Sequence, residues 1–349
     1  MSSTQDALAA IARFELGDGE VGGVCAHYVE LDQQDWIGSW GKSARSASEP
    51  PTAKTIFRAA SVTKMFTGLM LLQLAERRRV RLSDPLEEYV PEFGAIRLPN
   101  ERARPTLVQF ATMTAGLPPE VPTPGVNREL PPTGFERSVL AVIPQVDLVA
   151  EPGTRFVYSN LSYALLGLAC SRAAGAAYDE YVVREILKPL GMTQSSFGPT
   201  LGAIDSLAPG YDLTGGEIDA ATPEKEHRGR GYGLPAGGLY ATVHDLSLFA
   251  RFCLEGNEAV LTNASRELAY DGVVAADRDL NYGEGLGFAA LRDLQGRHAA
   301  TGHFGIVSGY KCGLVFNREA KKTLVVCTSI TRTADTTDLA REMIEIVSA

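Results

Sequence analysis

The residues best suited to covalent chemistry are Ser61 and Lys64, three positions apart at the start of an apolar stretch. The pattern predicts a helix over residues 61–79, on which residues at this spacing share a face. Serine is a weak nucleophile unless a nearby base takes its proton. Burial and the positive end of a helix both disfavour an ammonium group. Lys64 is therefore placed to be a neutral amine that activates Ser61.

The same spacing occurs twice more, at Ser39 with Lys42 and at Ser308 with Lys311. The first pair lies in a glycine-broken strand and the second in a hairpin connection, where residues three apart point in different directions. The competing interpretation of Ser61 is a plain helix N-cap, with its lysine extending to solvent. The chain has no G-x-S-x-G sequence, so a nucleophile elbow is not expected.

A second polar group is formed by Tyr158 and Asn160. A phenol beside a lysine can share its proton and act as a second acid or base. An asparagine side chain can hold both the lysine and a substrate amide or carbonyl. The alternative is a core tyrosine followed by an asparagine that caps the next helix.

A third group lies on a predicted strand, where His303 stands between Gly302 and the Phe304–Gly305 pair. Glycine allows another backbone to approach closely, and a strand amide can complete an oxyanion hole with the Ser61 amide. A lone histidine in a strand is more often structural than catalytic.

The elements that position these groups come from both ends of the chain. Strand patterns lie near the N-terminus and again near the C-terminus, over residues 21–31, 35–42, 297–304, 309–317 and 321–330. Helical spacing marks both ends of the chain, over residues 7–17 and 338–347. Most of the intervening chain is helical or loop, with helices expected within residues 105–117, 133–143 and 161–175.

This layout predicts an α/β (α+β) fold, with an antiparallel sheet built from both chain ends and flanked by the terminal helices. Residues 1–60 and 231–349 would form the sheet domain and residues 61–230 a large, mostly helical insert. The active site would lie at their interface. The proline-rich loop over residues 117–134 is long for a compact domain and predicts a functional lid or a mobile segment.

Composition narrows the classes of partner. The chain has 349 residues, 45% of them hydrophobic, and a formal charge of −9, which disfavours nucleic acid and anionic membranes. Its five scattered cysteines predict reduced, buried thiols, and its histidines show no metal-ligand spacing. No metal or cofactor is expected. The first residues lack a signal peptide and no apolar run is long enough to cross a membrane, so a cytoplasmic protein is expected.

Residues 61–64 (SVTK), 158–160 (YSN) and 303–305 (HFG) resemble the three ordered motifs of the serine β-lactamase and penicillin-binding-protein superfamily. The resemblance extends over roughly residues 20–330. It is closest to the branch with class C β-lactamases, D-alanyl-D-alanine carboxypeptidases, D-aminopeptidases and β-lactamase-like carboxylesterases. It implies a β-lactamase/transpeptidase-like fold.

The resemblance also implies an acyl-enzyme mechanism on a small acyl substrate. Ser61 would attack a carbonyl while Lys64 and Tyr158 move protons. The amides of Ser61 and Ile306 would hold the oxyanion. Two further side chains would contact the substrate, with Asn160 positioning it and His303 lining the pocket beside Phe304 and Gly305.

One departure from the family pattern bears on the substrate. Phe304 stands where many members that act on lactams or D-alanyl peptides have threonine, or where related hydrolases have serine. The missing hydroxyl favours a neutral or apolar acyl group, and hence a carboxylesterase on small or medium acyl esters. Alternatives are a D-amino-acid peptidase, a β-lactamase or other amide hydrolase, and an acyltransferase using the same acyl-enzyme. A non-catalytic acyl-binding sensor is the alternative of a different class, and the oligomeric state is left open.

Overall fold

The structure is a computed structural model that describes most of the chain: residues 2–17, 21–44, 46–96, 104–120, 134–198, 206–212, 214–218, 231–270, 282–293, 296–331, 333 and 335–349. Most of the lid expected over residues 117–134 lies outside the described residues, as do residues 97–103.

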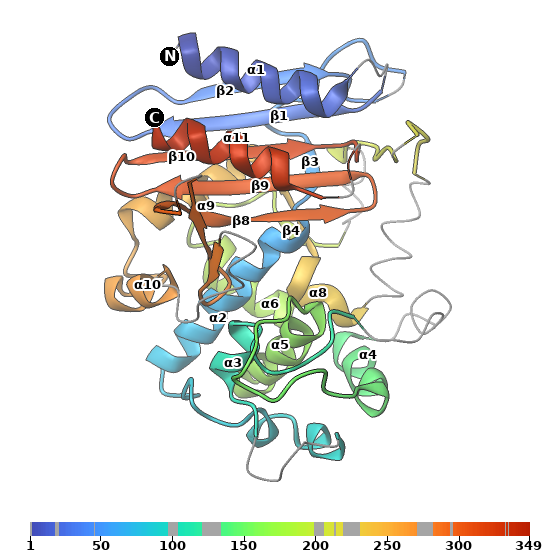
Figure 1. The fold of residues 1–349 in the computed structure, drawn as a ribbon, viewed down its shortest axis with the longest axis vertical. Coiled ribbons are helices and arrows are strands. Elements are labelled where there is room, and N and C mark those ends of the chain that lie inside the picture. Colours follow the sequence, from blue (N-terminus) through green and yellow to red (C-terminus); the bar gives the residue numbers. More distant parts are fainter. Residues whose placement is uncertain are drawn as a thin grey trace.

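A seven-stranded antiparallel sheet forms the upper half of the molecule in Figure 1. Its strand order is β2-β1-β10-β9-β8-β7-β6, so strands from the two chain ends lie side by side, and β1 pairs with β10. The expected sheet of chain-end strands is confirmed. The strands are β1 (Gly23–Glu30), β2 (Trp36–Gly41), β6 (Tyr282–Glu284), β7 (Ala289–Arg292), β8 (His298–Val307), β9 (Tyr310–Asn317) and β10 (Lys322–Thr328).

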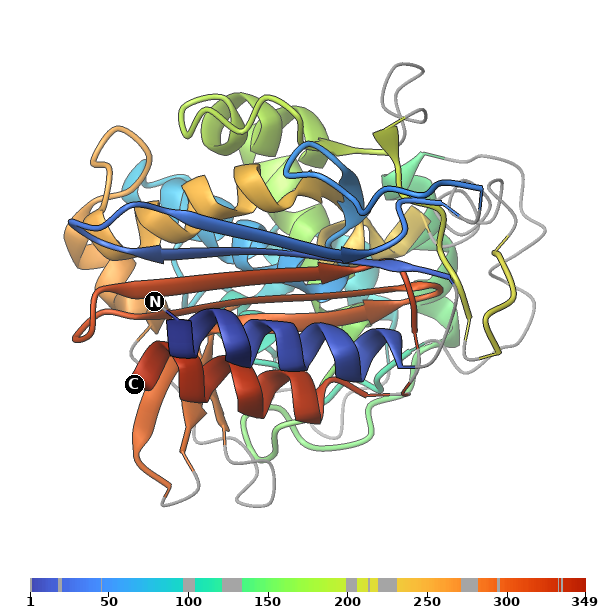
Figure 2. The same ribbon diagram turned by 90° about the horizontal axis from the view of Figure 1, so that it is seen from above.

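The two terminal helices, α1 (Ser2–Leu16) and α11 (Thr337–Ser348), lie next to each other on one face of this sheet (Figure 2). Helix α9 (Val243–Glu255) packs against β1, β9 and β10 from the other face. Alternate residues of each strand serve the two faces. In β1, Val24 and Ala26 pack with the terminal helices, whereas Cys25 belongs to the larger core on the opposite side.

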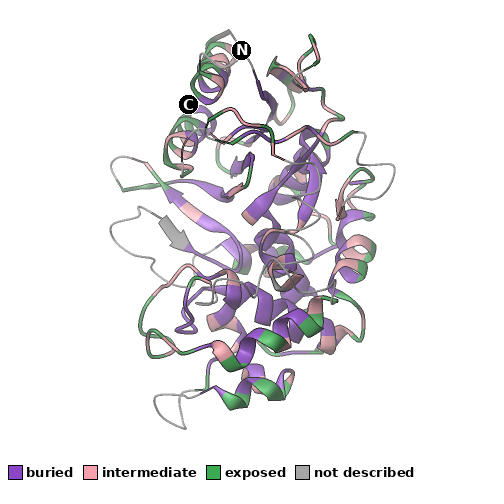
Figure 3. Ribbon diagram, turned by 90° about the vertical axis from the view of Figure 1, so that its right-hand side faces the viewer, coloured by how far each residue is buried: buried purple, intermediate pink, exposed green. Residues whose placement is uncertain are grey.

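The lower half is helical and is built around α2 and α5, which pack against each other. Both helices are buried on nearly every side, which matches their uniformly apolar sequences. Figure 3 shows this burial at the centre of the molecule, with exposed residues on the outer surfaces. Besides α1, α9 and α11, the α-helices of the described residues are α2 (Thr63–Glu76), α3 (Leu107–Ala111), α4 (Phe135–Val142), α5 (Asn160–Ala174), α6 (Tyr178–Val182), α8 (Leu234–Gly237) and α10 (Asn263–Tyr270).

A small three-stranded sheet lies at the junction of the two halves. It consists of β3 (Ile56–Arg58), β5 (Leu239–Thr242) and β4 (Ser196–Phe197), with β5 in the centre. Pairing of β3 with β5 brings the chain before α2 next to the chain after α8. The two segments are about 180 residues apart in sequence, and their meeting point is where the predicted nucleophile lies.

The helix expected over residues 61–79 differs at both ends. It begins with the 3-10 turn η1 (Ala60–Val62) and continues as α2 from Thr63 to Glu76. It ends earlier than expected because Arg78 adopts a left-handed conformation, with φ of 55°, which terminates the α-helical hydrogen bonding. The three consecutive arginines at residues 77–79 therefore follow the helix instead of forming its last turn.

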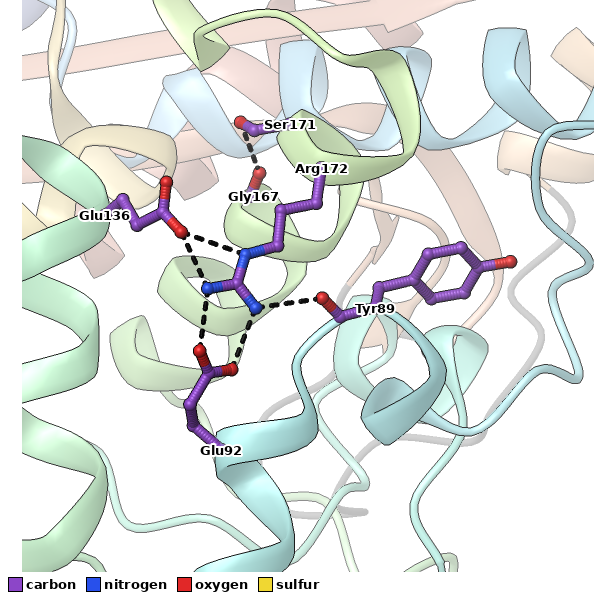
Figure 4. Close-up of polar contacts among 6 residues, drawn as sticks. All are labelled: Tyr89, Glu92, Glu136, Gly167, Ser171 and Arg172. Atoms are coloured by element: carbon purple, nitrogen blue, oxygen red, sulfur yellow. Dashed lines mark hydrogen bonds and ion pairs between the residues drawn. The ribbon is translucent and has the colours of Figure 1, made fainter.

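A cationic side chain fastens the exposed side of α5. Arg172 binds both carboxylate oxygens of Glu92, at 2.8 and 2.9 Å, and also contacts Glu136 on α4 (Figure 4). Its Nη1 also donates to the backbone carbonyl of Tyr89. One guanidinium group thus joins three segments of the helical half, using the planar fork geometry that suits a carboxylate.

All five cysteines are buried and unbonded, as the sequence predicts. The closest two, Cys312 and Cys327, have sulfur atoms 3.5 Å apart, well beyond disulfide bond length. Within the described parts of the chain, no helix is both long enough and apolar enough to cross a membrane.

Candidate active site

Ser61 is placed by a short connection between β3 and α2. The Ala59 amide donates to the Leu239 carbonyl at 2.9 Å, which extends the β3–β5 pairing up to the turn. Ala60 then adopts a left-handed conformation with φ of 48°, which is unfavourable for a residue with a side chain. Ser61 is the middle residue of the 3-10 turn that begins at Ala60, and its hydroxyl does not cap α2. The plain N-cap interpretation of Ser61 is therefore wrong.

Two threonines fix the first turns of α2 against the chain around α8. Thr63 donates to the Ala60 carbonyl at 2.6 Å and accepts a hydrogen bond from the Leu239 amide at 3.1 Å. One turn later, Thr67 donates to the Pro235 carbonyl at 2.7 Å. These bonds hold the lysine between them at a fixed distance from the backbone of α8.

Lys64 is completely buried, and its amine faces three oxygen atoms. Nζ is 3.0 Å from Ser61 Oγ, 2.7 Å from Asn160 Oδ1 and 3.0 Å from the Ala236 carbonyl. All three are uncharged acceptors, so none compensates fully for the loss of water around an ammonium group. Burial accordingly lowers the pKa of Lys64 to about 7, although the charges of Glu284 and Glu120 oppose the shift.

The start of α5 supplies Tyr158 and Asn160. Ser159 caps this helix by accepting from the Ser162 amide at 3.0 Å, and its own hydroxyl donates to the Pro118 carbonyl. The Asn160 amide group donates to Glu120 at 2.6 Å. That bond fixes the orientation of the amide, so that its oxygen faces Lys64.

The Tyr158 ring lies beside the lysine, with Lys64 Nζ 4.8 Å from the ring centroid. Its hydroxyl hydrogen-bonds to Ser61, which favours the ionised form, but burial has the larger effect and raises the pKa of Tyr158. At neutral pH this phenol therefore keeps its proton, while the amine of Lys64 is close to its titration midpoint. The two groups differ in what they can do: one can donate a proton and the other can accept one.

Strand β8 passes directly against the nucleophile. A Cβ atom at Gly305 would overlap the backbone nitrogen of Ser61 and the side chain of Ala60, so only glycine allows this approach. The approach brings the Ser61 amide next to β8 at the residue before Ile306. The geometry is compatible with the predicted oxyanion hole, in which the amides of Ser61 and Ile306 would bind the carbonyl oxygen.

His303 lies on the same face of β8 as Gly305. Its ring centroid is 6.4 Å from that of Tyr158, and its Nδ1 donates to the Phe304 carbonyl at 2.6 Å. Burial, together with the nearby Lys64 charge, lowers the pKa of His303 to about 3. The imidazole is therefore neutral at physiological pH and acts as a wall of the site with a fixed tautomer.

Phe304 points to the opposite face of β8 from His303, as strand alternation requires. It packs with the core beneath α11, and a Cβ at Gly313 on the neighbouring strand would contact its ring. Phe304 and Ser61 nevertheless line the same cavity. The sequence predicts that Phe304 lines the pocket, and in the structure it does so from the face of β8 that packs against α11.

The cavity has a volume of about 710 Å³, within the range of small-molecule sites. At one end its wall contains Ser61, Tyr158 and Asn160. It continues between β7, β8 and α11, where apolar side chains alternate with charged ones. The residues of this extension include Ala289, Leu291, Arg292, Phe304, Thr337, Ala340, Arg341, Ile344 and Glu345.

The structure thus brings together every residue that the sequence singled out, from three segments that are distant in the chain. Sequence reasoning missed Glu120, Glu284, the carbonyl of Ala236 and the two threonines of α2. Thr63 and Thr67 are four residues apart and share a helix face, and Thr67 also shares a face with Lys64, so their spacing was a signal that could have been noticed. The carboxylates carry no local signal. Across the described residues no cluster of histidine, cysteine or acidic side chains could hold a metal ion.

Several known proteins are similar to this chain in sequence or in fold. Beta-lactamase-like protein 2 of Dictyostelium discoideum is 30% identical over 308 residues, which are 87% of this chain and 55% of the relative. The D-alanyl-D-alanine-carboxypeptidase/endopeptidase AmpH of Escherichia coli strain K12 is 34% identical over 163 residues, which are 46% of this chain and 42% of the relative. The chain therefore spans about half the length of these curated relatives.

Among solved structures, EstCE1, described as a hydrolase with promiscuous acyltransferase activity, matches with a TM-score of 0.80 at 20% identity. The match covers 100% of this chain and 99% of that one. A class C β-lactamase in complex with cefoxitin matches with a TM-score of 0.81 at 16% identity, over 99% of this chain and 98% of that one, and this match confirms the expected β-lactamase/transpeptidase-like fold. The family model named Beta-lactamase matches residues 8–348. The chain belongs to the Beta-lactamase family, within the superfamily of serine β-lactamases and penicillin-binding proteins.

Proposed function

We propose that this protein is a serine hydrolase that forms a covalent acyl-enzyme on Ser61, and that it acts as a carboxylesterase on small or medium acyl esters. The observation that carries the proposal is the contact of Lys64 with Ser61. A buried amine lies 3.0 Å from the serine hydroxyl, and its pKa is lowered to about 7. A base with a pKa near the working pH is what general base catalysis requires.

In the proposed acylation step, Ser61 Oγ bonds to the ester carbonyl carbon and Lys64 takes the hydroxyl proton. The backbone amides of Ser61 and Ile306 stabilise the oxyanion. When the bond to the alcohol oxygen breaks, Tyr158 donates its proton to that oxygen, because its raised pKa keeps it protonated until then. Tyr158 then regains a proton from the ammonium of Lys64, and water releases the acyl group by the reverse sequence.

The cavity wall supports an ester with a neutral acyl or alcohol group. Phe304, Leu291 and Ile344 give the wall between the sheet and α11 an apolar surface. No hydroxyl is available at position 304 to hold a substrate carboxylate. The similarity to EstCE1 in fold is consistent with ester chemistry, and its described acyltransferase activity fits the same acyl-enzyme with an alcohol replacing water.

A D-amino-acid peptidase or amide hydrolase is the second candidate. It is favoured by Arg341 on α11, which lines the cavity and carries a guanidinium of the kind that binds carboxylates, as its pair with Asp338 illustrates. The 34% identity to the carboxypeptidase AmpH over part of the chain supports the same alternative.

The test is the intact mass of the protein after brief mixing with p-nitrophenyl butyrate, a penicillin or a fluorophosphonate. Ser61→Ala is compared with Ser308→Ala, which removes the serine of another Ser-x-x-Lys sequence. We expect an adduct on the wild type and on Ser308→Ala, and none on Ser61→Ala, with the butyrate ester reacting faster than the penicillin. Faster reaction of the penicillin would favour amide chemistry. An adduct that persists in Ser61→Ala would contradict the choice of nucleophile.

A further inference from the structure

Glu120 is a carboxylate that lies beside the proposed catalytic groups and has no role in the mechanism above. It follows two prolines whose carbonyls are bonded to the start of α5. The Ser159 hydroxyl donates to the Pro118 carbonyl at 2.6 Å. The backbone amide of Asn160 donates to the Pro119 carbonyl at 3.0 Å. These bonds place Glu120 against the Asn160 side chain, whose Nδ2 donates to Glu120 Oε1 at 2.6 Å.

The bond to Glu120 determines which end of the Asn160 amide faces the lysine. A carboxylate has no hydrogen to donate, so the group that meets Glu120 is the NH2 of the amide. The carbonyl oxygen of the amide, Oδ1, then lies 2.7 Å from Lys64 Nζ. This oxygen can only accept a hydrogen bond from the amine. In the reversed orientation, the NH2 would face Lys64 and two oxygens would face each other at Glu120.

The neighbours of Lys64 therefore decide where its hydrogens point. A neutral amine has two hydrogens and one lone pair. Two of the three oxygens around it accept only, namely Asn160 Oδ1 at 2.7 Å and the Ala236 carbonyl at 3.0 Å. Both hydrogens are bonded to these two oxygens, which leaves the lone pair for the third neighbour, Ser61 Oγ at 3.0 Å. A serine hydroxyl can donate as well as accept, so it can give its hydrogen to that lone pair.

We propose that Glu120 is a positioning residue for acylation, which acts through Asn160 to keep the lone pair of Lys64 directed at Ser61. This inference rests on the proposed role of Lys64 as the base. When Lys64 takes the Ser61 proton, the ammonium has three hydrogens for three oxygens, so neither neighbouring group has to turn. Without Glu120 the amide can reverse, and its NH2 would then compete with the Ser61 hydroxyl for the lone pair.

The first measurement follows the Asn160 side chain directly, by NMR of protein labelled with ¹⁵N-asparagine. Its NH2 signal is assigned by its absence in Asn160→Ala. In Glu120→Met this signal should shift and its hydrogens should exchange faster with water, because the hydrogen that bonds to the carboxylate is released. Glu136→Met is the matched control. It removes a carboxylate that pairs with Arg172 near the far end of α5, and it should leave the Asn160 signal unchanged.

The second measurement is a double-mutant cycle on the rate at which a fluorophosphonate labels Ser61, read by intact mass. Asn160→Ala and Glu120→Met should each lower the rate about 100-fold, the loss expected for a misdirected catalytic group. The double variant should be no slower than the slower single variant, because Glu120 has no amide to orient once Asn160 is replaced. Glu120→Gln keeps an oxygen that can accept from Asn160 and should recover part of the rate. Glu120 is only partly buried, and melting curves establish that each variant is folded.

The outcomes separate this inference from the proposed function. An unchanged Asn160 signal in folded Glu120→Met would overturn the role of Glu120, whatever the protein hydrolyses. Losses that multiply in the double variant would also overturn it. Glu120 would then act without Asn160, for example through the charge by which it raises the pKa of Lys64. A shifted signal together with an unlabelled wild-type serine would support the orientation of the amide by Glu120 and contradict the proposed hydrolase mechanism instead.

Discussion

Two buried lysines in this protein follow a serine by three residues, and the structure treats them in opposite ways. Lys64 and Lys311 are 0% and 1% exposed, so burial alone does not distinguish them. Lys311 lies on β9, and its amine contacts both carboxylate oxygens of Glu15 on α1, at 3.0 and 3.2 Å, as well as Thr333. Lys64 has only uncharged oxygens within hydrogen-bond distance.

The difference lies in where the negative charge is placed. Glu15 bonds directly to Lys311 and fixes α1 to the sheet, which is a structural use of a lysine. Glu120 and Glu284 affect the pKa of Lys64 through their charges, but neither carboxyl group hydrogen-bonds to its amine. A lysine can serve as a base when its hydrogen bonds aim it without keeping it charged. Ser-x-x-Lys spacing in the sequence carries none of this information.

The largest expected effect separates the two lysines by activity. Lys64→Met should lower the rate of Ser61 acylation by roughly 10²–10⁴-fold, the usual contribution of a general base. Lys311 pairs with Ile306 across the sheet, but its amine contacts Glu15 and Thr333 instead of Ser61, so the folded fraction of Lys311→Met should keep its rate. The check is the kcat for p-nitrophenyl butyrate, normalised to folded protein. Comparable losses in both variants would remove the functional distinction between the lysines.

The next effect concerns stability, where Lys311→Met is expected to be the damaging substitution. Lys311→Met removes the ammonium group that pairs with the buried carboxylate of Glu15, which should cost about 3–5 kcal/mol of unfolding free energy. The double variant Glu15→Leu with Lys311→Met should regain most of that loss, because both charges are then gone. Unfolding in guanidinium chloride measures each difference. If the single and the double variant were equally destabilised, packing and not the charge would explain the cost.

An effect of similar size is the pH dependence of stability that Lys64 causes. Its pKa is about 7 in the folded protein and about 10.4 in an unfolded chain, so between these values the unfolded state binds more protons. Below pH 7 the buried ammonium destabilises the fold fully, and this cost is relieved as pH rises towards 10. Lys64→Met should therefore be more stable than the wild type near pH 7, by a margin that narrows towards pH 10.

The measurement is the free energy of unfolding of both proteins at several pH values. Taking the difference between them cancels the titration of tyrosines and cysteines that the two proteins share. A margin that stayed constant from pH 7 to pH 10 would show that Lys64 does not titrate in this range.

Much of this arrangement could be predicted because its signals are local. Alternating residues indicated the chain-end strands, and the apolar run after Ser61 indicated a buried helix. The odd position of Lys64 at a helix start pointed to a neutral amine, and its lowered pKa agrees. Gly305 was expected to allow close approach, and it does so at the Ser61 amide.

The rest depended on contacts between distant segments. Glu284 follows α2 by more than 200 residues, and nothing near it in the sequence indicates that it faces Lys64. The bond between Lys311 and Glu15 joins residues 296 positions apart. Phe304 lines the cavity, but the face of β8 on which it lies depends on how the strands of the sheet pair. Local sequence patterns predict helices and strands, whereas the charges that surround a side chain depend on how distant segments pack together.

The smallest expected effect concerns a cation that is not buried. Arg172 keeps 24% of its side chain exposed and binds Glu92 and Glu136, and its contact lowers the pKa of Glu92 (Figure 4). Arg172→Met should cost only about 1 kcal/mol, because water and salt screen exposed pairs. The contribution from Glu92 should be present above pH 5 and be lost as pH falls below the unfolded pKa of about 4.3. Arg318→Met, which breaks an exposed ion pair with Glu267 and a contact with the Tyr270 ring, should cost less still, since Glu267 is the one carboxylate that pairs with that guanidinium among the described residues. If Arg172→Met instead cost as much as Lys311→Met, exposure would not be what separates the cost of losing Arg172 from the cost of losing Lys311.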